Sequence, residues 1–127
     1  MKNIKCWQVW LADIPINEKT HRQGKIRPVV IISNDRCNYY SDYLSIIPFT
    51  SNLRKKILPT HLYLTLDKAQ ECGIDTESIL LCEQVGGLDK WNLIHPLGEI
   101  TDEELKNEIK EKTFLQLFDE DNLVMTA

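Results

Sequence analysis

The sequence predicts a mainly β protein, a small antiparallel sheet or barrel followed by one C-terminal helix. Five apolar, β-prone runs come first, at residues 7–14, 29–32, 43–49, 61–66 and 78–85. The clearest helical pattern follows them, at about residues 102–118. Because no strands and helices alternate along the chain, a parallel sheet is disfavoured.

The first two runs are separated by a polar stretch. Residues 7–14 are apolar with partial alternation and stop at Pro15. The polar stretch from Pro15 to Ile26 is typical of a surface loop, and loops of this length are often functional. Residues 29–32 are continuously β-branched and follow Pro28, which predicts a strand buried on both faces.

The later runs differ in pattern. Residues 43–49 form another predicted strand, which ends near Pro48. Residues 61–66 alternate, with Leu62, Leu64 and Leu66 on one face, and so predict a half-buried strand. Residues 78–85 predict one further apolar strand, closed by Gly86 and Gly87.

The predicted helix at about 102–118 carries both a start signal and an apolar face. Thr101 and Glu104 have the spacing of a capping box, in which the Thr101 hydroxyl accepts the amide proton of Glu104. Asp102 and Glu103 suit the positive helix end. The expected apolar face consists of Leu105, Ile109, Phe114, Leu117 and Phe118.

Length and composition favour a single domain over residues 1–127, because domains commonly have about 100–150 residues. No apolar run approaches the roughly 18 residues that a membrane span needs, so no membrane association is expected. The first seven residues contain two lysines but no apolar segment behind them, so a secretory signal is not expected. A cytoplasmic location follows as the default.

Four cysteines could form two disulfides, a zinc site or simply reduced thiols: Cys6, Cys37, Cys72 and Cys82. Structural zinc usually needs two close pairs of ligands. Here the closest two, Cys72 and Cys82, are ten positions apart, and no histidine lies in ligand register. Scattered, partly buried thiols are the favoured interpretation.

Charge is divided along the chain. Residues 1–63 contain ten lysines and arginines and four acidic residues, a balance of +6. Residues 64–127 contain five lysines and no arginine against fifteen acidic residues, a balance of −10, so that the whole chain carries a net charge of −4. A basic half can attract phosphates locally despite the overall sign, although solvated surface charge is the simpler interpretation.

Four segments, in this order, resemble the MazF/PemK/Kid family of toxin endoribonucleases. The first segment joins residues 10–14 to residues 22–35 and includes Arg27-Pro28. The second segment is residues 46–51 and ends in Thr50-Ser51. The third segment is residues 58–61, and the fourth is residues 81–85 with 88–90. Together they cover about residues 7–118. Each segment alone is weak, but all four occur at roughly the spacing of the family.

This resemblance implies an SH3-like barrel and a homodimer. It implies a toxin that cleaves single-stranded mRNA without a metal or other cofactor, leaving a 2′,3′-cyclic phosphate and a 5′-hydroxyl. It also implies a cognate antitoxin, whose acidic, largely disordered segment would cover the basic half of the chain.

Two residues carry over as catalytic: Arg27 from the Arg-Pro motif of the family and Thr50 from its Thr-Ser motif. A planar guanidinium can bind two phosphate oxygens at once and stays charged at cellular pH. A threonine hydroxyl can donate a further hydrogen bond to the same oxygens. Arginine is a poor general base, so Arg27 is assigned phosphate stabilisation and leaving-group protonation, and no residue is assigned as the base.

The expected RNA-binding residues surround this pair and are Arg22, Gln23, Lys25, Ser51, Arg54 and Gln84. Each also has a simpler interpretation: Thr-Ser at a strand end is common turn chemistry, residues 54–56 form a charged turn, and Gln84 could end a sheet edge. His61 is interpreted as a surface or packing residue rather than a proton shuttle.

The chain departs from the family pattern at three places. Trp7-Gln8 stand where Gly-Asp is usual, and Arg22 stands where an acidic residue is frequent. Val85-Gly86-Gly87 replace Ile-Arg-Thr or Ile-Arg-Ser, which removes a charged side chain from the expected RNA groove. Two alternatives therefore stay open: a non-catalytic toxin of the CcdB type with a protein target such as DNA gyrase, and a degenerate homologue that only binds RNA or a partner.

Overall fold

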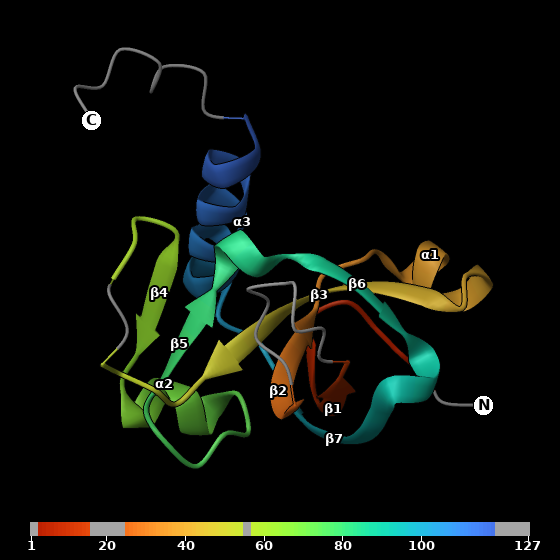
Figure 1. Cartoon of the computed structure of the whole chain (residues 1–127), viewed down its shortest axis with the longest axis horizontal. Coiled ribbons are helices and arrows are strands. Elements are labelled where there is room, and N and C mark those ends of the chain that lie inside the picture. Colours follow the sequence, from red (N-terminus) through yellow and green to blue (C-terminus); the bar gives the residue numbers. More distant parts are fainter. Residues whose placement is uncertain (1–2, 16–24, 55–56, 119–127) are drawn as a thin grey trace.

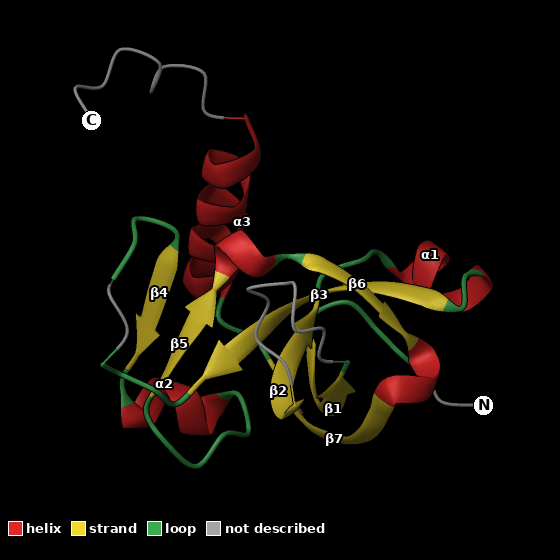
Figure 2. Cartoon of the chain, in the orientation of Figure 1, coloured by secondary structure: helices red, strands yellow, loops and turns green. Residues whose placement is uncertain are grey.

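The computed structural model of the chain describes residues 3–15, 25–54 and 57–118. These residues form an antiparallel sheet with helices at its turns and a longer helix at the end (Figure 2). The strands are β1 (Gln8–Ile14), β2 (Lys25–Ile31), β3 (Tyr43–Thr50), β4 (His61–Leu64), β5 (Ser78–Leu81), β6 (Gly86–Asp89) and β7 (Leu93–Glu99). The helices are α1 (Asp35–Tyr40), α2 (Leu66–Glu71), α3 (Glu103–Phe118) and the 3₁₀ turns η1 (Cys82–Gln84) and η2 (Lys90–Asn92).

Strand β3 is the centre of the sheet, whose order is β4-β5-β3-β2-β1-β7. Strand β6 also pairs with β3, and η2 leads from β6 into β7. The path β6-β3-β2-β1-β7 thus curls round on itself, while β3 extends past it towards β5 and β4 (Figure 1). This confirms the prediction of a mainly β, barrel-like fold with a C-terminal helix.

The sheet separates two apolar cores, and β2 contributes to both. Val29 and Ile31 lie in the core inside the curled strands, whereas Val30 lies in the core beneath α3, and all three are fully buried. Alternate side chains of a strand point to opposite faces, so burial on both faces follows directly. The prediction is confirmed for residues 29–31, but the strand already begins at Lys25, within the predicted loop, and it ends at Ile31, before Ile32.

Helix α3 packs with only part of its predicted apolar face. Leu105 and Ile109 are buried in the core beneath the helix. The last turns extend beyond the sheet (Figure 1), and the rest of the predicted apolar face does not pack on the core, since Phe114, Leu117 and Phe118 are 62%, 53% and 60% exposed.

The predicted capping box of α3 is also wrong by one residue. The amide of Glu104 donates to Oδ1 of Asp102 at 3.0 Å, not to Thr101. The helix begins at Glu103, which makes Asp102 the residue that precedes it and caps it. Nζ of Lys68 donates to the same carboxylate at 2.9 Å and ties α2 to the start of α3.

Two predicted strands end earlier than expected. Leu64 is the last residue of β4, because the Thr65 hydroxyl accepts the amide proton of Lys68 and starts α2, which leaves Leu66 42% exposed. Residues 78–85 are not one strand, since the chain turns at η1 after Leu81. Gly86 and Gly87 open β6 instead of closing a strand.

All four cysteines are free thiols, in agreement with the favoured interpretation. Cys72 and Cys82 are buried in the core beneath α3, Cys6 is half-buried and Cys37 is exposed. Among the described residues, no helix has the length and apolarity to cross a membrane.

Candidate active site

Arg27 and Thr50 lie at the same end of the β2–β3 pair. The register of the two strands pairs Val29 with Pro48. Arg27 lies two residues beyond Val29 on β2 and Thr50 lies two residues beyond Pro48 on β3, so both residues lie just past the last pair of this register. Residues two apart share a face of a strand, and the two side chains therefore belong to the same face.

Arg27 is held in the sheet and partly shielded from water. Its backbone pairs with Ala12 of β1, its side chain is half-buried, and Pro28 follows it in the strand. Burial lowers the pKa of the Arg27 guanidinium from its ordinary value. The group remains a cation near neutral pH, and partial loss of water strengthens its attraction for a phosphate.

Thr50 ends β3 with its hydroxyl already oriented. Its backbone pairs with Ile79 of β5, and its side chain is 1% exposed. Oγ1 accepts the amide proton of Asn52 at 3.1 Å. Because this bond occupies an acceptor site of the oxygen, the hydroxyl proton is left to donate to another group.

Ser51 and Arg54 lie on the turn that follows Thr50. The amide of Arg54 donates to Oδ1 of Asn52 at 3.2 Å, so two side-chain bonds build this turn. Both Ser51 and Arg54 are exposed. The turn thus presents a hydroxyl and a guanidinium next to Thr50.

Lys25 extends the cationic end of the site. It is exposed, pairs with Ile14 of β1 and lies two residues before Arg27 on the same strand. Its φ of +71° is in the left-handed region, which is uncommon for a residue other than glycine. Arg22 and Gln23, the two remaining RNA-binding predictions in this part of the chain, lie outside the described residues.

Gln84 reaches the site from the other edge of β3. Strand β5 pairs with β3 at Phe49 and Thr50, and β6 pairs with it from Ile46 backwards. The turn η1, which joins β5 to β6, therefore passes β3 between these two points, and the half-buried Gln84 is its last residue. The structure thus gathers Lys25, Arg27, Thr50, Ser51 and Arg54 at one end of the β2–β3 pair, with Gln84 beside β3 a few residues before that end.

The departure at Gly87 has a structural explanation. A Cβ atom at Gly87 would lie 2.0 Å from Cε2 of Tyr43, so the tyrosine ring covers this glycine. Tyr43 begins β3 and is 61% exposed. Where the family pattern has the Thr or Ser side chain, this chain presents an aromatic ring.

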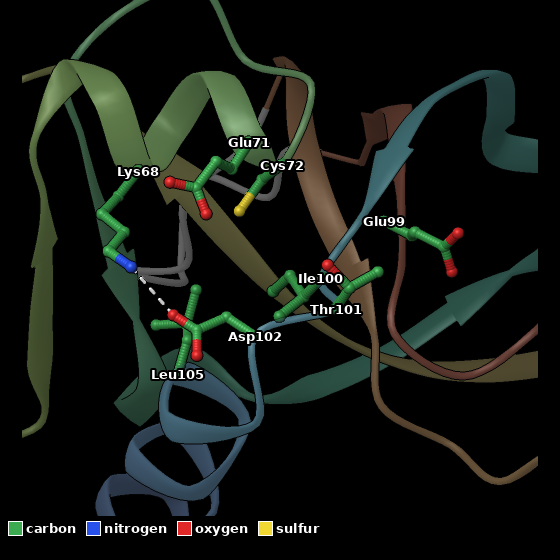
Figure 3. A pocket seen from close by; sticks show the side chains of 8 residues that line it. All are labelled: Lys68, Glu71, Cys72, Glu99, Ile100, Thr101, Asp102 and Leu105. Carbon is green, nitrogen blue, oxygen red and sulfur yellow. Dashed lines mark hydrogen bonds and ion pairs between the residues drawn. The ribbon is translucent and has the colours of Figure 1, made fainter.

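Two hollows elsewhere contain none of these residues. The hollow between α2 and the start of α3 has a volume of about 10 Å³, room for one water molecule, and contains the Lys68–Asp102 ion pair (Figure 3). A larger groove of about 220 Å³ lies between β4 and α3, and its charged lining consists of three acidic residues, Asp102, Glu104 and Glu108, and one lysine, Lys68. An acidic groove repels phosphates, so neither hollow competes with the end of β3 as an RNA site.

No group of three or more His, Cys, Asp or Glu side chains that could hold a metal ion occurs in the part of the chain that the structure describes. Sequence reasoning missed one polar cluster near Gln84, formed by Thr60, His61 and Glu83. Glu83 carried no signal of its own, because it is a single acidic residue between the apolar residues of β5 and Gln84.

A barrel-like antiparallel sheet with cationic and hydroxyl groups at one strand end defines a class of small β proteins suited to binding phosphates. A sequence model of the family described as PemK-like, MazF-like toxins of type II toxin–antitoxin systems matches residues 5–112. This chain belongs to that family.

Comparisons with individual proteins agree with membership of this family. The endoribonuclease MazF of Staphylococcus saprophyticus is 37% identical over 99 residues, which cover 77% of this chain and 78% of that protein. The crystal structure of MazF from Deinococcus radiodurans superposes with a TM-score of 0.72 at 23% identity, over 92% of this chain and 98% of that chain. An endoribonuclease from a mycobacterial species, solved in complex with its cognate antitoxin, has a TM-score of 0.67 at 18% identity, over 90% and 94% of the two chains.

Proposed function

We propose that this chain is the toxin of a type II toxin–antitoxin system and acts as an endoribonuclease on single-stranded RNA. The observation that supports the proposal is that Arg27 and Thr50 lie at the same end of the β2–β3 pair, in a chain of the PemK/MazF family. The 37% identity to an endoribonuclease MazF supports the reaction class.

In the proposed reaction a ribose 2′-hydroxyl attacks the adjacent phosphorus. The bond between O2′ and phosphorus forms and the bond between phosphorus and O5′ breaks, which leaves a 2′,3′-cyclic phosphate. The 2′-hydroxyl loses its proton and the departing O5′ gains one. Negative charge builds on the non-bridging phosphate oxygens in the transition state, and these oxygens are what the site must stabilise.

Arg27 is the proposed phosphate clamp. Its guanidinium can donate to two phosphate oxygens at once, and because it already carries its proton before the reaction it cannot take the proton of the 2′-hydroxyl. Burial lowers its pKa, which favours donation of a proton to the departing O5′. Thr50 adds one hydrogen bond to the same phosphate, in the direction left open by the Asn52 amide.

Thr50 is almost closed to solvent in the free chain, so RNA binding must open this end of β3 slightly. We assign Lys25, Ser51, Arg54 and Gln84, with Arg22 and Gln23, to RNA contacts around the scissile phosphate. Lys25 and Arg54 are exposed cations that suit neighbouring phosphates, whereas Gln84 suits the edge of a base.

The cognate partner is an antitoxin with an acidic segment, which the cationic end of β3 would attract. A mycobacterial endoribonuclease with this fold was solved in complex with its cognate antitoxin. We also propose a homodimer without bound metal or cofactor in the cytoplasm. The rival function, a CcdB-type toxin with a protein target, would not need Arg27 and Thr50 to meet, and a degenerate RNA-binding homologue would keep affinity without cleavage.

One experiment tests the proposal and separates these rivals. Purified protein is incubated with a long RNA in excess EDTA, and the fragment ends are identified by mass spectrometry. We expect cleavage with cyclic phosphate ends, and a loss of at least about 100-fold in rate for Arg27→Ala. Arg36→Ala, which removes an exposed arginine from α1, is the matched control and should cleave like the wild type.

Absence of cleavage of any RNA by the wild type would overturn the proposed activity. RNA binding without cleavage would favour the degenerate homologue, and loss of both would favour a protein target. Undiminished cleavage by Arg27→Ala would remove Arg27 from the mechanism.

A further inference from the structure

A buried hydrogen-bonded cluster adjoins Gln84 and has no part in the proposed chemistry. It joins the start of β4 to η1, and its members are the Leu58 backbone, Thr60, His61 and Glu83. Nε2 of His61 lies 2.9 Å from Oε2 of Glu83, and the Thr60 hydroxyl donates to Oε1 of Glu83 at 3.2 Å. Thr60 and His61 are 9% and 8% exposed.

The hydrogen bonds fix the protonation of His61. Nδ1 accepts the amide proton of Leu58 at 3.2 Å, so it carries no proton of its own. The ring proton must then lie on Nε2 and be donated to Glu83. His61 therefore connects the turn before β4 to the Glu83 carboxylate through both of its ring nitrogens.

Glu83 in turn holds η1. This turn has three residues and no side-chain cap, and its closing bond from the Val85 amide to the Cys82 carbonyl is long at 3.4 Å. Both Glu83 oxygens are bonded to the segment that begins β4, and the Cys82 amide also donates to the Thr60 carbonyl at 3.3 Å. The position of η1 beside β3 thus depends on this cluster together with the packing of Cys82 in the core beneath α3.

Gln84 follows Glu83 directly. Successive side chains of a 3₁₀ turn point about 120° apart, so a Glu83 fixed towards β4 directs Gln84 away from β4. Without the His61–Glu83 hydrogen bond, η1 would lose this attachment to β4 and the Gln84 side chain would no longer be held in one orientation.

We propose that His61 is a positioning residue for RNA cleavage, which acts through Glu83 to hold Gln84 against the RNA at the end of β3. The inference rests on the proposed function for its reaction, but it gives a role to a residue that the sequence indicated only as a surface or packing residue and that does not touch the RNA.

Two substitutions of His61 separate its two hydrogen bonds. In Gln the amide nitrogen can replace Nε2 and still donate to Glu83, but the acceptor for Leu58 is lost. In Asn the amide oxygen can replace Nδ1 and accept from Leu58, but the side chain is too short for Glu83. Each variant loses one bond, so a purely structural role predicts similar effects on melting temperature and on activity.

We expect His61→Gln to keep kcat/KM within about 3-fold of the wild type and His61→Asn to lose about 10- to 100-fold, at similar melting temperatures. His95→Asn and His95→Gln are matched controls, because His95 is exposed on β7 and, within the described part of the chain, its ring bonds to the carbonyl of the neighbouring Pro96. Both controls should cleave like the wild type.

A double-mutant cycle with Gln84→Ala tests the route of the effect. If His61 acts through Gln84, His61→Asn should have almost no further effect in the Gln84→Ala protein. An equal fold-loss in both backgrounds, or wild-type activity in His61→Asn, would overturn the inference. So would equal losses in the Asn and Gln variants.

Affinity for a 2′-O-methyl RNA, which has no attacking hydroxyl, gives a readout that does not depend on cleavage. We expect His61→Asn to weaken this affinity by the same factor as Gln84→Ala, and His61→Gln to leave it unchanged. Failure of the wild type to cleave would overturn the proposed activity alone, whereas an unchanged affinity in His61→Asn would overturn the positioning role.

Discussion

Burial determines the reactivity of two cysteine side chains. Cys72 and Cys82 are 2% and 0% exposed, and burial raises the pKa of each thiol to about 11. At about pH 8 only roughly one molecule in a thousand would carry either thiolate, which is the form that reacts. We expect iodoacetamide to modify the exposed Cys37 rapidly and to leave Cys72 and Cys82 intact until the protein unfolds, as read by peptide mass spectrometry.

The same two thiols link stability to alkaline pH. Their pKa values are raised on folding, so the folded chain binds these protons more tightly than the unfolded chain. Their contribution to stability is complete below about pH 9 and is lost as the pH rises towards 11. A variant with alanine at both positions should lose less unfolding free energy than the wild type over this interval in urea titrations. Parallel pH curves, or modification of Cys82 as fast as Cys37, would contradict the assignment.

At the scale of elements, the start of α3 depends on Asp102. Its carboxylate accepts from the Glu104 amide and from Nζ of Lys68. We expect Asp102→Ala to lower the melting temperature by more than Thr101→Ala, which removes only the residue that the sequence pattern indicated. Asp102→Asn should lie between wild type and Asp102→Ala, because an amide oxygen can cap the helix but has no charge for Lys68.

The pH dependence of that difference provides a second check. The hydrogen bond from Lys68 lowers the pKa of Asp102 below its usual range, so its charge contributes to stability above the ordinary carboxyl pKa. This contribution is lost as the pH falls through the lowered value. The unfolding free energies of the wild type and of Asp102→Asn should therefore differ near neutral pH and become equal in acid. A difference in unfolding free energy that persists in acid would contradict the ion pair.

The sequence predicted elements well where one periodicity continues, and poorly where capping residues interrupt it. The first and third strands were located to within one residue. Helix α1 was not predicted: it begins after the second strand, where the Asn34 side chain accepts the Cys37 amide proton. Strand β7 was missed because Pro96 and Gly98 are unfavourable in strands, although its pairing with β1 accommodates them with two register shifts.

At the scale of the whole molecule, the site depends on contacts between distant segments. Arg27 and Thr50 could be proposed from motifs, but only the register of β2 and β3 places them together. The His61–Glu83 bond joins residues 22 positions apart on different elements, and no periodicity along a single segment can indicate such a contact. Alternation along residues 61–66 correctly identified Leu62 and Leu64 as buried but gave no partner for His61.

Charge division is the property of the whole molecule that bears most directly on RNA binding. The basic half contributes β2 and β3, with Lys25, Arg27 and Arg54 at one end of this pair, whereas α2 and α3 come from the acidic half. Charges further apart than about 10 Å are largely screened at 0.1 M salt. A net charge of −4 therefore does not prevent a strand end with three cations from attracting phosphates.

This division predicts a local salt dependence. Each phosphate neutralised on single-stranded RNA contributes about 0.7 to the slope of log affinity against log salt concentration. We expect Lys25→Ala and Arg54→Ala each to lower the slope for 2′-O-methyl RNA by about that amount. Lys90→Ala is the control, because Lys90 lies at the opposite end of β3: its amide donates to the Asp42 carbonyl, next to Tyr43. The seven residue steps from Tyr43 to Thr50 span roughly 23 Å. Because that distance exceeds the screening length, Lys90→Ala should leave the slope unchanged. Equal slopes for all three variants would show that the RNA does not bind along the β2–β3 end.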